Sequence, residues 1–206
     1  LWAFSALPAA AATAADLQVF DVTARPFEEL LNTEIITAAK LARQVSDAPS
    51  AVSIVTAQDI RAYGYRTLDD ILSSMRGLHL AHDFRYAYLG GRGYGNPGDY
   101  AGRITLLIDG YAAPDGYFGQ SYFGADGFLD VELIERVEYI PGTGSSSYGG
   151  AAFLGVVNVI TKKGAAFGGA QAALDFGSHG LRKQRITWGK RFDNGGDLLL
   201  SASAYR

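Results

Sequence analysis

The sequence of 206 residues contains no cysteine and only 19% charged residues. The absence of cysteine excludes disulfide frameworks, thiolate zinc sites and cysteine nucleophiles. Lys and Arg (18) do not outnumber Asp and Glu (21), and the net charge of -3 argues against a nucleic-acid-binding protein, which needs a basic face. No run of about 18 apolar residues is present, so no membrane-spanning helix is expected. The short, alternately apolar strands of a transmembrane β-barrel remain compatible with this composition.

Glycine and aromatic residues are abundant instead. The 26 glycines and the 12% of aromatic residues, with so little charge, are typical of a β-rich protein. Residues 1–15 are apolar at their start and rich in alanine at their end, and Ala12, Thr13 and Ala14 form the small-x-small pattern that a signal peptidase recognises. We interpret residues 1–15 as a signal-peptide remnant of an exported protein. The alternative is an artificial low-complexity alanine tail.

Regular structure is expected from Pro49 onward, because residues 16–48 show only weak periodicity and are interpreted as an extended linker. Residues 51–55 are predicted to form a short strand. A helix is then predicted to begin after Thr56, with Asp59 three residues on as its capping partner, and to end at Gly64.

A second helix is predicted after Thr67, which has Asp70 at the same capping distance, and Gly77 is expected to end it. Its apolar residues follow the i, i+3, i+4, i+7 spacing of a buried helix face and are expected in the core: Leu68, Ile71, Leu72 and Met75.

Two apolar runs further along the chain are predicted to be buried strands. Residues 104–108 lead into an Asp109-Gly110 turn, and residues 156–160 end at two lysines. The periodicity of residues 134–140 fits a helix or a strand. Together these elements predict a small α+β domain.

From about Gly168 the pattern changes to three strands of about nine to ten residues, each with one apolar and one polar face. The expected apolar face is made by Ala172, Leu174, Phe176, Ile186, Trp188, Phe192, Leu198, Leu200, Ala202 and Ala204. Barrel strands that face lipid outward and a polar lumen inward have this pattern, and so does a soluble antiparallel sheet. Because the pattern stops at Arg206 with an unpaired strand edge, we expect the chain to be a fragment of a longer protein.

Five blocks in residues 49–163 follow one another in a family-specific order: residues 49–60, residues 66–78, Arg92-Gly93, residues 106–110, and residues 134–162 with their Ile-Glu-Arg-Val-Glu start. In this order the blocks resemble the TonB-dependent outer-membrane receptors. The resemblance implies an α+β plug domain, a small mixed sheet with short helices, over residues 49–165. It also implies that residues 166–206 are the first three antiparallel strands of an incomplete transmembrane β-barrel.

One departure from the family concerns its plug–barrel contacts. The family usually has a basic residue and then Gly-Pro after the strand at 134–140, whereas Pro141-Gly142-Thr143 stands here. Arginines of the family's plugs pair with acidic residues of the barrel wall. The resemblance leaves Arg92 and Arg136 as the candidates for such contacts.

The resemblance also implies a TonB box, an extended segment ahead of the plug that pairs by strand addition with the periplasmic protein TonB. The segment that resembles it consists of Glu34, Ile35, Ile36, Thr37, Ala38 and Ala39. Residues 19–24 are a second candidate, and we prefer the first because its distance to the plug is more usual. An unstructured linker with chance β-forming residues is the alternative for both.

Other motifs give no enzyme. Residues 93–98 match GxGxxG, but Pro97 and the glycines around it preclude the helix that a dinucleotide site needs. His79 and His82 are too few for a predicted metal site. We therefore predict no catalytic residue, no metal and no cofactor. Three acidic residues without a nucleophile nearby are interpreted as a solvated strand edge or as barrel contacts: Glu132, Glu135 and Glu138.

Residues 84–128 hold 11 of the 25 aromatic residues and 11 of the 26 glycines, roughly twice their share by length. Tyr and Phe offer large, stiff contact areas, and glycine lets the backbone approach a ligand. In the family, loops at the outer end of the plug form the floor of the ligand site. The expected ligand contacts are Arg85, Tyr86, Tyr88, Tyr94, Asn96, Asp99, Tyr117, Tyr122 and Phe123, with packing against the barrel wall as the alternative for each.

The resemblance implies active import of a scarce ligand, such as a siderophore, cobalamin or another large solute, across the outer membrane of a Gram-negative bacterium. The expected partners are TonB with its inner-membrane energising complex, outer-membrane lipid and a small-molecule ligand, and no nucleic acid. The alternative function is a barrel-less, plug-like periplasmic module for binding or signalling.

Overall fold

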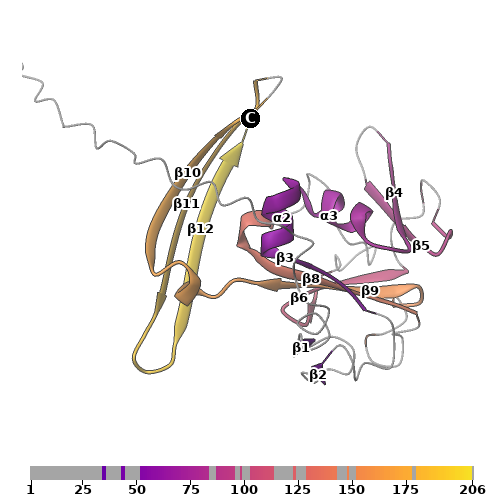
Figure 1. The fold of residues 1–206 in the computed structure, drawn as a ribbon, viewed down its shortest axis with the longest axis horizontal. Helices are drawn as coiled ribbons and strands as arrows, with labels where there is room; N and C mark the ends of the chain where they lie inside the picture. Colours follow the sequence, from indigo (N-terminus) through magenta and orange to yellow (C-terminus); the bar gives the residue numbers. More distant parts are fainter. Residues whose placement is uncertain are drawn as a thin grey trace, which may run out of the picture.

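The computed structural model describes residues 34–35, 43–44, 52–83, 87–95, 98, 103–113, 123, 129–142, 148, 152–177 and 180–205. They form an α+β domain (residues 52–163) followed by a separate three-stranded sheet (Figure 1). Two short strands that precede the domain, β1 (Glu34–Ile35) and β2 (Arg43–Gln44), pair with each other. Within the described ranges, every helix is too short or too polar to cross a membrane.

The α+β domain is built on a five-stranded mixed sheet with the strand order β3-β8-β9-β6-β7. Strands β6 and β9 run parallel, and the other neighbours run antiparallel. Residues 134–140, whose periodicity fitted a helix or a strand, lie in strand β8 (Ile134–Pro141), which pairs with β3 on one side and β9 on the other. The strand bounds are β3 (Ser53–Thr56), β6 (Ile104–Ile108), β7 (Tyr111–Ala112), β8 (Ile134–Pro141) and β9 (Gly155–Thr161).

Both expected capping boxes are present. The Thr56 side chain accepts a hydrogen bond from the Asp59 N–H at 3.3 Å, and the Asp59 carboxylate accepts one from the Thr56 N–H at 2.8 Å. Helix α2 (Ala57–Tyr63) then ends at Gly64, whose φ of 69° lies in the left-handed region. Thr67 caps α3 (Leu68–Ser74) in the same way.

Helix α3 ends earlier than the sequence predicts. Its helical geometry stops at Ser74, and Met75 is already extended, with φ -80° and ψ 137°. The extended backbone places the Met75 side chain in the core, where it is 4% exposed. Gly77, the expected end of the helix, makes the following turn with a φ of 85°.

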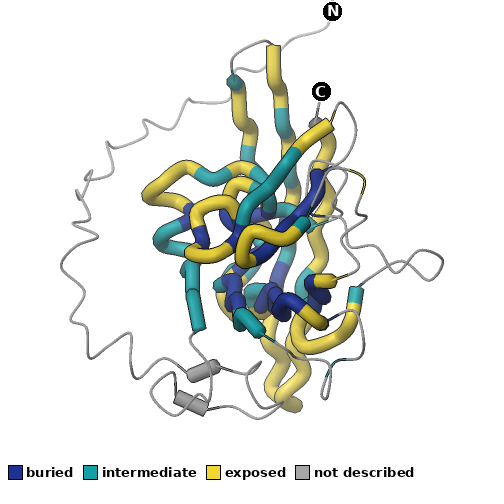
Figure 2. The backbone as a smooth tube through the Cα atoms, turned by 90° about the vertical axis from the view of Figure 1, so that its right-hand side faces the viewer, coloured by how far each residue is buried: buried dark blue, intermediate teal, exposed yellow. Residues whose placement is uncertain are grey.

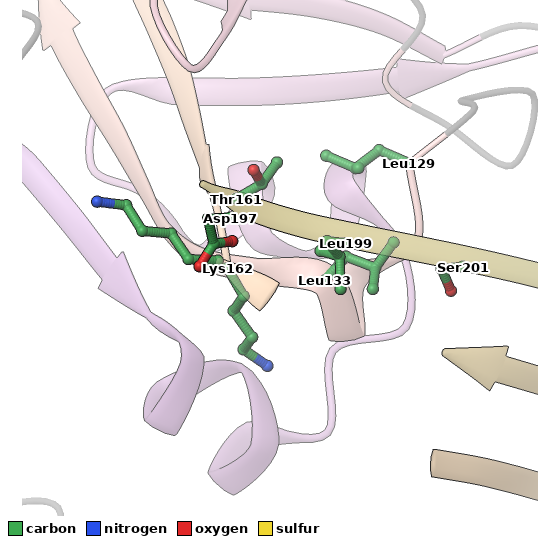
Figure 3. A pocket seen from close by; sticks show the side chains of 8 residues that line it. Leu129, Leu133, Thr161, Lys162, Asp197, Leu199 and Ser201 are labelled. Carbon is green, nitrogen blue, oxygen red and sulfur yellow. The ribbon is translucent and has the colours of Figure 1, made fainter. Parts of the chain in front are cut away.

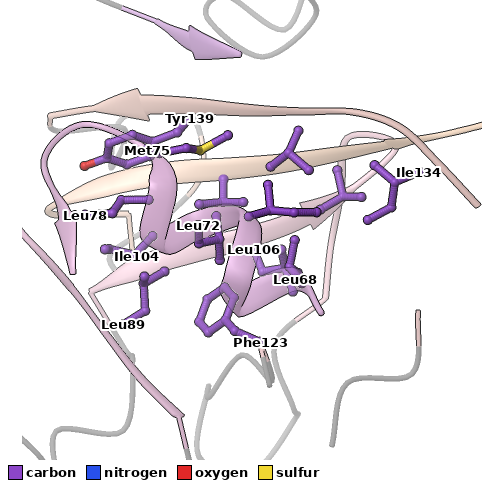
Figure 4. Close-up of a cluster of buried hydrophobic side chains, with 14 of the residues drawn as sticks. Leu68, Leu72, Met75, Leu78, Leu89, Ile104, Leu106, Phe123, Ile134 and Tyr139 are labelled. Atoms are coloured by element: carbon purple, nitrogen blue, oxygen red, sulfur yellow. The ribbon is translucent and has the colours of Figure 1, made fainter. Parts of the chain in front are cut away.

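The main core lies between α3 and one face of the five-stranded sheet (Figure 4). Burying a leucine or isoleucine side chain in such a core contributes about 1.5–3 kcal/mol. A hairpin of β4 (Leu78–His82) and β5 (Ala87–Gly91) adds Leu78 and Leu89 to the same cluster. The fully buried members from α3 and the sheet are Ile71, Leu72, Ile134, Val137, Tyr139, Val157 and Val159.

The three-stranded sheet consists of β10 (Gly169–Phe176), β11 (Arg182–Arg191) and β12 (Asp197–Tyr205), antiparallel and in sequence order. Its apolar face is exposed: Leu174 is 69% and Ile186 is 66% accessible. On the opposite, polar face, Thr187 is buried and shares a 2.9 Å hydrogen bond with Ser201 of the next strand. Figure 2 shows buried residues concentrated in the α+β domain, with long exposed stretches in these strands. The predicted fold class is confirmed.

Candidate functional site

Residues 91–94 form a two-residue hairpin turn that begins at the last residue of β5, and we name it the outer turn because the family resemblance predicts that loops of this segment lie at the outer end of the plug. The N–H of Gly91 donates to the carbonyl of Tyr94 at 2.8 Å, and the N–H of Tyr94 donates to the carbonyl of Gly91 at 3.0 Å. Arg92 and Gly93 between them have φ values of 54° and 80°, which a type I′ turn requires. The turn leaves Tyr94 64% exposed.

His79 on β4 braces the chain just beyond this turn. Its Nε2 lies 3.3 Å from the carbonyl oxygen of Gly95. The ring covers Gly90 so closely that a Cβ there would lie 2.2 Å from Cε1 of His79, so only glycine fits. His82 has a different partner, Asp69, at 2.8 Å. No group of three metal-binding side chains occurs in the described ranges.

A second cluster joins the α+β domain to the three-stranded sheet. Nζ of Lys183 on β11 lies 2.5 Å from Oδ1 of Asp130 and 2.9 Å from Oε2 of Glu132. Both carboxylates belong to the turn around η3 (Val131–Leu133), which leads into β8. Lys162, just after β9, donates to the backbone carbonyl of Glu132 at 2.6 Å. One short turn therefore receives contacts from the domain and from the sheet.

Burial and neighbouring charges shift the pKa values of Asp130 and Lys162, two groups of this cluster. Burial raises the pKa of Asp130, but hydrogen bonds from Lys183 and Ser203, with the positive charges of Lys183 and Arg185, lower it to a value below the ordinary 3.8. Burial lowers the pKa of Lys162, and the nearby cations Arg61 and Arg185 lower it further. At neutral pH, Asp130 is therefore a carboxylate that faces a lysine.

The chain passes from the domain into the sheet through the turn around η4 (Gly164–Ala166). The Asp197 carboxylate on β12 accepts hydrogen bonds from the N–H groups of Gly164 and Ala165 in η4 (Gly164–Ala166). Beside this turn lies an open cavity of about 390 Å³ between the domain and β12 (Figure 3). It is lined by Leu129, Leu133, Thr161, Lys162, Lys163, Asp197, Leu199 and Ser201.

Comparison with known proteins identifies the α+β domain. Residues 44–156, more than half of the chain, match the family model of the TonB-dependent receptor plug domain. The chain belongs to this family. The α+β domain is therefore the plug, and the expectation drawn from the residue blocks at 49–163 is confirmed.

The relatives of this plug protein are transporters and receptors. The chain is 27% identical over 174 residues to the vitamin B12 transporter BtuB of Vibrio vulnificus, which covers 82% of the chain and 27% of the relative. It is 30% identical over 135 residues to the iron-regulated outer membrane virulence protein of Vibrio cholerae, covering 64% of the chain and 20% of the relative. The chain thus spans about a quarter of the length of the curated relatives it matches.

Solved receptors share the fold of the plug and the strands after it. Pseudomonas aeruginosa FpvA bound to pyoverdine superimposes with a TM-score of 0.65 at 19% identity, over 87% of this chain and 23% of that one. The siderophore receptor PiuA from Acinetobacter baumannii gives a TM-score of 0.64 at 20% identity, over 86% of this chain and 24% of that one.

The two plug arginines expected to contact the barrel lie in different surroundings. Arg92 is exposed, and its Nη2 lies 3.9 Å from the point where a Cβ on Gly142 would stand. Its guanidinium thus lies beside Pro141-Gly142, where the family's basic residue is missing. Arg136 is 17% exposed and its Nε contacts Glu138 of the plug itself at 2.8 Å. Its described partners are plug carboxylates.

The acidic residues of β8 and its approach also differ from one another. Glu138 is fully buried and therefore not on a solvated strand edge as the sequence suggested. It lies between β3 and β9, opposite Ile54 and the buried Asn158, on the sheet face away from α3. Glu132, in contrast, contacts β11 through Lys183. A barrel contact was one of the two interpretations of Glu132 from the sequence, but Lys183 was not identified as a partner, because the two residues lie 51 positions apart.

The predicted ligand contacts separate into exposed and buried residues. Tyr94 is exposed on the outer turn. Tyr88 is buried and its hydroxyl donates to Asp83 at 2.7 Å, and Phe123 is 1% exposed within the main core. Both side chains are thus buried within the plug. The remaining candidates lie outside the described residues: Arg85, Tyr86, Asn96, Asp99, Tyr117 and Tyr122.

The TonB-box candidate begins with β1. Glu34 pairs with Gln44, and Ile35 pairs with Arg43, in an antiparallel two-residue ladder. The backbone of the first two residues thus has the extended conformation that strand addition uses. Residues 36–39 of the candidate, and the whole second candidate at 19–24, lie outside the described residues.

Proposed function

We propose that this chain is the plug and the first barrel strands of an outer-membrane receptor that imports a large, scarce solute with energy delivered by TonB. The observation that carries the proposal is the plug's position against the polar face of a sheet whose other face is apolar and exposed. A sheet with these two faces suits a barrel wall, with lipid outside and a plugged lumen inside.

Ligand selection is assigned to the outer turn and the aromatic-rich residues 84–128. Tyr94 supplies exposed aromatic area at the last residue of a turn that two backbone hydrogen bonds close. Rigid aromatic side chains bind large ligands with little loss of conformational entropy. The vitamin B12 transporter and the siderophore receptors among the similar proteins supply the first ligand classes to test, namely corrinoids and ferric siderophores.

Energy coupling is assigned to the segment that starts at β1. The TonB box pairs with TonB, tension on the segment displaces part of the plug, and the ligand passes between plug and wall. Arg92 is proposed to contact an acidic residue of the barrel, because its exposed guanidinium lies where the family's usual basic residue is missing. No bond of the ligand is made or broken in this scheme.

The experiment that tests the proposal uses the full-length receptor in the outer membrane of a host. We expect uptake of labelled cyanocobalamin or of a ferric siderophore that stops when TonB is absent. We also expect the unheated protein to migrate differently from the heated protein on a denaturing gel, as closed barrels do. Binding without uptake, together with migration unaffected by heating, favours the barrel-less module instead.

A further inference from the structure

We propose that Lys183 is the latch that holds the plug closed against the barrel wall, by binding Asp130 and Glu132 of the η3 turn. This inference rests on the proposed function, because it assumes that β10–β12 are barrel strands. Its polarity is the reverse of the contact that the family resemblance predicts. Here the plug supplies the carboxylates and the wall supplies the cation.

The contact of Lys183 with the η3 turn is partly buried, and the turn contributes two carboxylates to it. The side chains of Lys183 and Asp130 are each 16% exposed, and that of Glu132 is 34% exposed. Charge-assisted hydrogen bonds in such surroundings are stronger and less screened than those of fully exposed ion pairs. Removing the lysine leaves two carboxylates close together with no counter-charge at hydrogen-bond distance among the described residues.

Two neighbouring wall strands hold the same turn. Asp130 receives hydrogen bonds from Lys183 on β11 and from Ser203 on β12. On the plug side, Lys162 makes two hydrogen bonds to the turn. Its side-chain Nζ donates to the carbonyl of Glu132, and its backbone N–H donates to the carbonyl of Leu133 at 2.8 Å. The η3 turn can therefore leave the wall only when the contacts of Lys183 and Ser203 break, and Lys183 is the one that contacts both carboxylates.

The position of the turn in the chain connects the latch to the ligand region. Asp130 comes directly after the aromatic-rich segment that ends at residue 128, and η3 leads into β8. The far end of β8, at Pro141-Gly142, lies beside Arg92 of the outer turn. Two routes can thus carry a displacement of the proposed ligand-binding residues to the latch. One runs through Leu129, the residue between the aromatic-rich segment and Asp130, and the other runs along β8 from the outer turn.

The test removes the latch from the full-length receptor and measures leakage through the closed barrel. The variant is Lys183→Met, which keeps the length of the side chain and removes the charge. The matched control is Lys190→Met on the same strand, because Lys190 is on the opposite sheet face, with Nζ 5.5 Å from the centroid of the Phe192 ring. The probe is vancomycin, a solute too large for general diffusion pores, and its influx is measured in cells without TonB.

We expect vancomycin influx to rise about tenfold in Lys183→Met and to stay at the wild-type level in Lys190→Met. Lys183→Glu is expected to leak at least as much, and Lys183→Glu with Asp130→Lys to close again, because the reversed pair restores the attraction. The receptor level in the outer membrane and the shift on heating verify folding of each variant. A charge-reversed pair that leaks like Lys183→Glu, or a folded Lys183→Met that leaks no more than Lys190→Met, overturns the latch.

The two proposals fail in different ways in this design. If the receptor takes up neither cyanocobalamin nor a ferric siderophore but leaks vancomycin when Lys183 is replaced, the latch is supported and the proposed ligand classes are wrong. If the receptor imports one of these ligands and its folded Lys183→Met variant does not leak vancomycin, the proposed function is supported and the latch is wrong.

Discussion

Tyr94 is the exposed aromatic residue of the outer turn, and we propose that it contacts the ligand. The ring is 64% exposed, and the turn beneath it is held by two backbone hydrogen bonds and by His79. We expect Tyr94→Ala to weaken ligand binding by about tenfold, because an exposed aromatic anchor is lost while the turn keeps its shape. Equilibrium binding of the labelled ligand to outer-membrane vesicles measures this.

Tyr63→Ala is the control for this substitution, because Tyr63 is 62% exposed but lies on α2, far along the chain from the aromatic-rich segment. Equal affinities of the wild type and Tyr94→Ala would show that the ring only packs against the barrel. Equal losses in both variants would point to a general effect of removing tyrosine.

Asp130 makes the contact between the plug and β11 depend on pH in the acid range. Its pKa in the folded protein lies below the ordinary 3.8, because the hydrogen bonds from Lys183 and Ser203 outweigh the opposing effect of burial. A carboxyl group of this kind stabilises the folded state above its unfolded pKa, and the stabilisation is lost as the pH falls through the folded value. The contact is therefore expected to be intact at neutral pH and to weaken only below pH 3.8.

Hydrogen exchange of the backbone around η3, corrected for the intrinsic effect of pH, measures this weakening. Asp130→Asn is expected to remove part of the pH dependence, because the amide does not titrate. The same acid-induced increase in exchange in Asp130→Asn and in the wild type contradicts the assignment to Asp130.

At the scale of single elements, the short helices depend on their first residues. Helix α2 has only seven residues, too few to be stable alone, and its capping box satisfies N–H groups that the helix leaves free. We expect Thr56→Ala to lower the free energy of unfolding by about 1 kcal/mol. Urea denaturation of the 206-residue chain measures the change.

The control for the capping box is Ser73→Ala on α3, an exposed hydroxyl that donates to the carbonyl of Asp70 within its own helix. It is expected to change stability by less than about 0.5 kcal/mol. A loss in Thr56→Ala no larger than that in Ser73→Ala means that the packing of Ile60, not the capping box, holds α2 in place.

The capping boxes, the strands and most turns were predictable because their signals are local. Thr56 and Asp59 are three residues apart, and the Asp109-Gly110 turn at the end of β6 has the positive φ values, 49° and 84°, that its dipeptide suggests. The end of α3 was not predictable in the same way. The helix stops at Ser74, before the glycine that a local rule selects, and Met75 reaches the core from an extended backbone.

At the scale of the whole molecule, the proposed function requires the segment before the plug to transmit force. We expect deletion of residues 34–39 to abolish TonB-dependent uptake and to leave ligand binding unchanged, because strand addition by TonB needs this stretch. Uptake and binding of the same labelled ligand are measured in parallel on whole cells. Deletion of residues 19–24 serves as the comparison, and loss of uptake in that variant alone transfers the TonB box to the second candidate.

The α+β class of the plug and the three alternating strands followed from the sequence, because capping residues and hydrophobic periodicity act within short windows. The family followed from the resemblance of five residue blocks in order over residues 49–163. The burial of Glu138, the packing of Phe123 and Tyr88 inside the plug, and the binding of Lys183 to Asp130 and Glu132 became known only from the folded chain. Each of these depends on contacts between strands far apart in the chain, and charge and aromaticity alone do not specify which partner a side chain meets.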